Sequence, residues 1–235
     1  MAQYYRLNLG RCTYGEFWRL SRNPIEFALA ALLKTCGLLG SAPGGLGRPE
    51  LLIPLAIADL PPRVFAKLES WLAPLQQLGF AHGFAYTIPM VGAQEGFAIA
   101  LRGQNPLILA SLVYGRQRSE GTQMEQSAFA FLTPLQGTDY LVTSGKKKEL
   151  ESAPQARVER LPGADVHTVY ARHQQRIAAT PDTVPIRTEA EFNAFVLRYN
   201  LDEFDYFLQR GLYSPMSSEE AELQKAVQLA FQSEP

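Results

Sequence analysis

Large and small apolar residues alternate along the middle of the chain, and this alternation predicts β-strands between residues 80 and 143. The same two-residue period recurs at 97–101 and 126–133, and further apolar runs lie at 107–118 and 140–143. Short turns separate the runs, which favours a meander of about five antiparallel strands. In the first run, the large residues expected on one face are Phe80, His82, Phe84, Tyr86, Ile88 and Met90, and the small residues expected on the other are Ala81, Gly83, Ala85 and Thr87.

In three of these runs neither side is charged, which indicates a sheet covered on both faces, because a sheet with one wet face alternates apolar with polar residues. Ala and Gly on one side would let a helix approach closely. The bulky side must meet another layer, a ligand cavity or a second subunit. We favour covering by the protein's own helices.

Apolar residues at helical spacing predict four helices around the sheet region. Asp165 is placed to begin one of them, and the pairs Thr188–Glu191 and Ser217–Glu220 have the spacing of a capping box. Pro74 lacks a backbone N–H, so we expect it to kink or end the first helix early. The predicted helices cover residues 62–78, 165–179, 189–210 and 217–232.

The fold class that these elements predict is α+β: a central antiparallel sheet of about five strands covered by helices. Residues 1–49 form a basic, aromatic, helical N-terminal arm with a Gly-rich loop, and residues 50–235 form the α+β domain with its C-terminal helical set. Asn23 and Pro24 begin a helix in the arm. The apolar run at 25–39 is shorter than the roughly 20 residues that span a bilayer, and Lys34 interrupts it. We expect a buried helix here; peripheral membrane contact and a cleaved or spanning segment are less favoured alternatives.

Charge is distributed unevenly, although the net charge is only −1. Residues 1–48 carry six Lys/Arg and two Asp/Glu, and residues 188–235 carry three and nine. These segments could attract each other within one chain or between two, but two solvated surfaces are the favoured interpretation. The lysines at 146–148 have no interleaved aromatic residues, so we expect no nucleic-acid partner. Cys12 and Cys36 form no disulfide framework, which favours a cytoplasmic location.

Candidate chemistry centres on two histidines. If the helix that carries His173 packs on the strand face that carries His82, the pair could transfer protons or bind a ligand. The candidate ligand-binding residues are therefore His82, Tyr86, Tyr170 and His173. No further ligand accompanies the histidines at metal-binding spacing, so we expect no metal and no cofactor. Separately buried, hydrogen-bonded histidines are the favoured alternative.

Other signals of catalysis are missing from the sequence. There is no GxSxG, SxxK or GxGxxG motif, and catalytic residues stay unknown. Asp202, Glu203 and Asp205 are interpreted as a solvated helix face rather than an acid/base pair.

The stretch TDYLVTSG at 138–145, followed after a polar linker by LPGADVHTVYARHQ at 161–174, resembles an uncharacterised bacterial protein family. The resemblance covers residues 138–174, about a fifth of the chain, and implies no activity, cofactor or functional residue.

Two classes of function stay open. The first is a non-catalytic binding or assembly protein, which would use the aromatic sheet face and the oppositely charged terminal segments for a protein partner or for self-association. The second is a small-molecule binder or enzyme with a pocket between the sheet and the C-terminal helices. We favour the first, because no catalytic constellation is visible.

Overall fold

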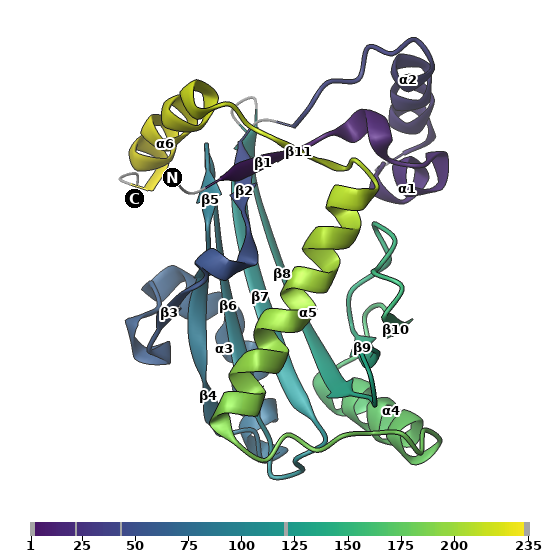
Figure 1. Cartoon of the computed structure of the whole chain (residues 1–235), viewed down its shortest axis with the longest axis vertical. Helices are drawn as coiled ribbons and strands as arrows, with labels where there is room; N and C mark the ends of the chain where they lie inside the picture. The colour runs from purple at the N-terminus through teal and green to yellow at the C-terminus, as the bar shows by residue number, and fades with distance from the viewer. Residues whose placement is uncertain (1–2, 22, 43, 120–121, 233–235) are drawn as a thin grey trace.

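The computed structural model describes residues 3–21, 23–42, 44–119 and 122–232. In these residues a seven-stranded sheet carries helices on both faces, and a four-stranded sheet lies at one end (Figure 1). The α-helices are α1 (Tyr14–Leu20), α2 (Pro24–Thr35), α3 (Pro62–Gln77), α4 (Val166–Ala178), α5 (Glu189–Gln209) and α6 (Ser218–Gln232). The strands are β1 (Tyr4–Leu7), β2 (Gly45–Gly47), β3 (Ile53–Leu55), β4 (His82–Ile88), β5 (Met90–Val91), β6 (Gln94–Arg102), β7 (Leu109–Ser119), β8 (Thr122–Pro134), β9 (Tyr140–Ser144), β10 (Ala156–Arg160) and β11 (Tyr213–Pro215).

Side-chain caps fix the starts of the helices, as the sequence predicts. Asp165 accepts the backbone N–H of Thr168, and Thr188 and Glu191 form a capping box at α5. Ser217 and Glu220 exchange the same pair of hydrogen bonds before α6. Pro74 does not end α3 early, because it lies in the last turn of the helix, which continues to Gln77.

The predicted α+β class is confirmed, but the sheet is larger than about five strands. The predicted strands are β4, β6, β7, β8 and β9, which pair antiparallel in that order. The sheet gains β3 beside β4 at one edge, and β10 pairs parallel with β9 at the other. β10 has the polar sequence ARVER and lies in a segment that we expected to be only a connector.

The expected division into a bulky face and a slim face is wrong. The register places Phe84 opposite Ala100 and Tyr86 opposite Ala98, so large residues of β4 share a face with small residues of β6. Residues that are directly opposite in a sheet point to the same side. Each face therefore combines large and small side chains, and each face carries a packed cluster, although the covering on the α5 side is incomplete.

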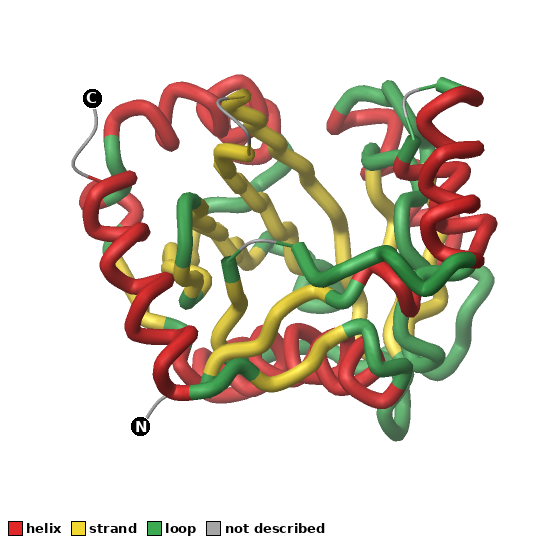
Figure 2. The backbone as a smooth tube through the Cα atoms, turned by 90° about the horizontal axis from the view of Figure 1, so that it is seen from above, coloured by secondary structure: helices red, strands yellow, loops and turns green. Residues whose placement is uncertain are grey.

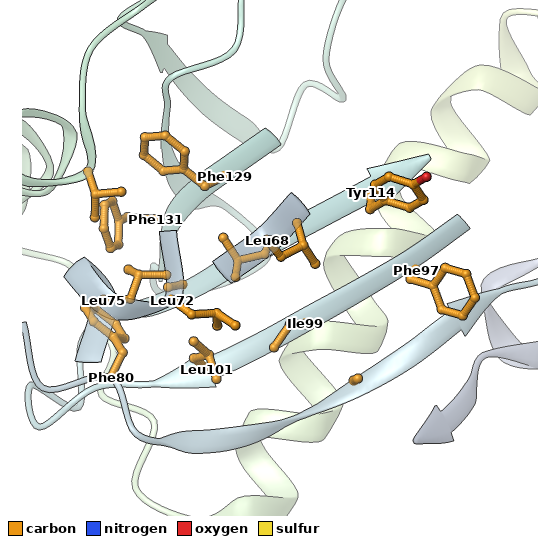
Figure 3. Close-up of a cluster of buried hydrophobic side chains, with 14 of the residues drawn as sticks. Leu68, Leu72, Leu75, Phe80, Phe97, Ile99, Leu101, Tyr114, Phe129 and Phe131 are labelled. Carbon is orange, nitrogen blue, oxygen red and sulfur yellow. The ribbon is translucent and has the colours of Figure 1, made fainter. Parts of the chain in front are cut away.

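The face behind the sheet in Figure 1 packs against α3 and α4. Leu68, Leu72 and Leu75 of α3 lie over the aliphatic and aromatic side chains of β6 and β8 (Figure 3). On the opposite face α5 crosses the strands diagonally, and its Phe192 and Phe195 pack on Tyr86 and its neighbours. Seen from above, the strands run between helices on either side (Figure 2).

The N-terminal arm contains strands as well as helices. Its β1 lies between β2 and β11, so the arm and the C-terminal region share the small sheet. Ion pairs join the basic and acidic segments within this one chain: Arg6 to Glu220 at 2.7 Å, and Arg48 to Asp205 at 3.1 Å.

A buried carboxylate anchors α1. Glu16 is fully buried and accepts hydrogen bonds from Arg210 at 2.6 and 2.8 Å and from the backbone N–H groups of Thr13 and Glu151 at 2.8 and 2.9 Å. Burial alone would raise its pKa, but the hydrogen bonds and the charge of Arg210 outweigh burial and lower the pKa to about 2. Three separate segments therefore meet at this one side chain.

The segment at 25–39 is not the buried helix that we expected. α2 has no fully buried residue, and only one side of it, with Phe27 and Ala30, packs against a small core cluster. Ile25, Leu29 and Leu32 form an outward stripe and are 82%, 57% and 60% exposed. No helix in the described part of the chain has both the length and the apolar character needed to cross a bilayer.

Candidate ligand-binding site

An open cleft lies between the C-terminal half of α5 and the sheet face that this helix crosses. Its volume is about 430 Å³, which is within the range of about 300–1,000 Å³ that is usual for small-molecule sites. Val113 lies in the central strand β7, yet its side chain is 37% exposed because it faces this opening. The floor around it is made of short side chains that do not fill the space below the helix: Ala98, Ser111, Ala128 and Ala130.

Tyrosine hydroxyls form a hydrogen-bonded group on the wall of the cleft. The hydroxyl of Tyr199 lies 3.2 Å from that of Tyr86 and 3.1 Å from the hydroxyl of Ser111. The amide of Asn200 donates to the Tyr86 hydroxyl at 3.3 Å. Burial raises the pKa of Tyr86 well above its usual value, so this hydroxyl stays protonated at neutral pH. The wall therefore offers neutral hydrogen-bonding groups beside an apolar floor.

Charged side chains border the cleft near β10 and the loop that precedes it. Lys146 pairs with Glu149 at 2.8 Å, and Arg160 donates to the Ser152 hydroxyl at 2.8 Å. Burial lowers the pKa of the Arg160 guanidinium, although that group stays protonated at neutral pH. The border is therefore predominantly polar, in contrast to the floor.

Glu203 also borders the cleft, and it is exposed, so the solvated helix face predicted for it opens onto this cleft. It lies on α5 one turn after Tyr199 and one turn before Phe207, which both line the cleft. The protein around Glu203 raises its pKa by desolvation, while the charges of Arg160 and Lys146 oppose that rise.

His173 has a structural role in the core on the other side of the sheet. It is fully buried, and its two ring nitrogens lie 2.9 Å from the Thr133 hydroxyl and 2.8 Å from the Thr143 hydroxyl. Burial, assisted by the charge of Arg176, lowers its pKa to about 3. His173 is therefore neutral at physiological pH and connects α4 to β8 and β9.

The four candidate residues from the sequence do not form one site. Tyr86 borders the cleft, whereas Tyr170 packs in the core on the α4 side, against Phe80 and Phe131. His82 is exposed on the strand side that faces α5, so it cannot meet His173 across the sheet. His82 and Arg102 line two surface hollows of about 350 and 360 Å³ near the start of α5.

Sequence reasoning missed Glu203, Arg160, Ser111 and the partnership of Tyr199 with Tyr86. Ser111 carried a usable signal, since a hydroxyl in the middle of an apolar strand needs a hydrogen-bond partner. Tyr199 follows Phe192, Phe195 and Val196 at helical spacing, which indicates a buried helix face but no polar partner. Glu203 follows Asp202 and Arg160 follows Glu159, so each lies in a charged stretch that gave no sign of a cleft.

The described residues contain no group of three or more His, Cys, Asp or Glu side chains that could hold a metal ion. Cys12 is buried and Cys36 is exposed, and neither forms a disulfide. Comparison with protein-family models, with curated proteins and with solved structures finds no match to this chain.

Proposed function

We propose that the protein binds a small molecule in the cleft between α5 and the sheet. The exposure of Val113 carries the proposal, because an aliphatic side chain at the centre of a sheet is ordinarily covered. The apolar floor suits a ligand with a largely apolar body, and the hydroxyls of Tyr86 and Tyr199 offer hydrogen bonds that fix its orientation. A concave apolar surface with a few converging polar groups is the usual form of a ligand site.

The neutral dye N-phenyl-1-naphthylamine, whose fluorescence rises in apolar surroundings, tests this proposal. We expect the wild-type protein to enhance its fluorescence. Ala130→Phe and Ala128→Phe each place a ring on the floor of the cleft and should abolish the enhancement. The matched control is Ala73→Phe, because Ala73 is exposed on α3 at the opposite face of the sheet.

Circular dichroism melting shows whether each variant is folded, and one folded cleft variant is sufficient for the comparison. If both cleft variants enhance the dye as strongly as Ala73→Phe does, the dye binds elsewhere and the proposal is wrong.

A second candidate function is self-association through α2, which the exposed stripe of Ile25, Leu29 and Leu32 favours. Two copies could bury the same stripe against each other in an isologous contact. Sedimentation should then show a dimer for the wild type and a monomer for Leu29→Glu. A wild type that remains monomeric at high concentration excludes this function.

A further inference from the structure

Glu203 presents a carboxylate to the cleft without a partner. Within the described ranges it accepts no hydrogen bond and joins no ion pair, whereas Lys146 and Arg160 each contact a neighbour on the same border. Glu203 is exposed on the cleft, so its carboxylate oxygens are open to accept hydrogen bonds from a ligand. A ligand group that supplies donors and positive charge would complement this side chain.

An ammonium group fits this position. It brings three N–H donors and a positive charge, and charge-assisted hydrogen bonds to carboxylates are among the strongest in proteins. Tyr140, Tyr199 and Phe207 also line the cleft. Their ring faces attract cations, which adds to the attraction of the carboxylate.

Arg160 restricts the ligand further. It borders the cleft on β10 and is close enough to Glu203 to act on its charge, yet no ion pair joins the two side chains in the described residues. A ligand that carried only a positive charge would be repelled by Arg160, and a purely anionic ligand would be repelled by Glu203. A molecule with both charges satisfies both side chains.

We infer that the cleft binds a zwitterion of the amino-acid type, with an apolar body on the alanine floor, its ammonium on Glu203 and its carboxylate on Arg160. This inference rests on the proposed function, since it assigns the ligand class of the same cleft. Glu203 then binds the positively charged group of the ligand, and Arg160 binds the negatively charged group.

Three probes with the same phenyl body separate the two charges: phenylalanine, 2-phenylethylamine and 3-phenylpropanoate. Binding is followed by protein-observed NMR titration of the full chain at neutral pH. We expect phenylalanine to bind at least about tenfold more tightly than either singly charged probe, because loss of one charged hydrogen-bonding contact weakens binding by about that factor or more.

Three variants then assign the contacts. Glu203→Gln should weaken phenylalanine and 2-phenylethylamine at least about tenfold without weakening 3-phenylpropanoate. Arg160→Gln should weaken phenylalanine and 3-phenylpropanoate, and Arg160→Lys, which keeps the charge, should restore part of the loss. Thermal melting of Glu203→Gln should match the wild type, because no partner within the protein is lost.

The outcomes separate the two proposals. Equal binding of all three probes, or equal losses of all three in Glu203→Gln, overturns the zwitterion inference even if the neutral dye still binds the cleft. If neither the dye nor any of the three probes binds, the cleft proposal fails as well.

Discussion

The buried pair of Glu16 and Arg210 gives the sharpest prediction about stability. Arg210→Met removes both charged hydrogen bonds to Glu16 and leaves a fully buried carboxylate with only its backbone donors. Removing one partner of a buried ion pair costs about 3–5 kcal/mol. We expect Arg210→Met to lose a stability of this order at pH 7, measured by urea denaturation.

A surface pair provides the control. Arg157 pairs with Asp139 at 2.8 Å, with side chains 49% and 38% exposed, and such pairs contribute about 0–1 kcal/mol. Arg157→Met should therefore change the stability little. Glu16→Gln combined with Arg210→Met should recover part of the loss, because the uncompensated charge is gone.

Tryptophan fluorescence can locate the effect. Trp18 lies on α1 and Trp71 on α3, so Trp71→Phe leaves a reporter of the arm and Trp18→Phe leaves a reporter of the sheet core. We expect Arg210→Met to lower the urea midpoint reported by Trp18 at least as much as the midpoint reported by Trp71. If both reporters show that Arg210→Met loses no more stability than Arg157→Met does, the reasoning is refuted.

The pH dependence of the same carboxylate has a defined sign. The pKa of Glu16 is lowered from 4.5 to about 2 on folding. Its stabilising contribution is therefore complete above pH 4.5 and is lost as the pH falls from 4.5 towards about 2. Urea denaturation at pH 5 and pH 3 should show a smaller loss in the Glu16→Gln variant than in the wild type.

Three further changes test the core. The pKa of His173 falls from 6.5 to about 3 on folding, so between these pH values His173 is protonated in the unfolded chain but not in the folded protein. The free energy of unfolding should therefore decrease below pH 6.5 at up to about 1.4 kcal/mol per pH unit. Urea denaturation at pH 7 and pH 5 should show this loss reduced in His173→Gln, and an unchanged loss would contradict it. Gly83→Ala would press a Cβ against a backbone oxygen of β6 and should lower the stability by about 1–3 kcal/mol. In Gly40→Ala the new Cβ meets no atom, so the stability should not change. Equal melting temperatures of the two variants would count against this packing. Leu68→Ala in the core should cost about 2–5 kcal/mol by urea denaturation, and Leu32→Ala on the exposed stripe should cost far less; a similar cost for both would mean that α2 is covered in solution.

Local signals in the sequence predicted the elements well. The caps at Asp165, Thr188 and Ser217 depend on residues three positions apart, and the strands depend on alternation within a few residues. The division of the two sheet faces failed because it depends on register. A single strand shows which of its residues share a side, but only pairing shows which side of the next strand joins them.

The site was harder to predict than the fold, because its residues come from distant parts of the chain. Tyr86 lies on β4, Ser111 on β7, Arg160 on β10 and Glu203 on α5. The cleft exists because a straight helix crosses a sheet whose floor is made of small residues at that place. Neither the crossing angle nor the gap leaves a periodic signal in the sequence.

The position of β1 between β2 and β11 has a consequence for synthesis on the ribosome. Residues 4–7 leave the exit tunnel long before residues 213–215, which form one of their two neighbouring strands. Apolar side chains of the arm therefore stay uncovered until residues 213–215 have emerged. Nascent chains stalled before residue 213 should hold this region open and recruit chaperones, and release should let it close.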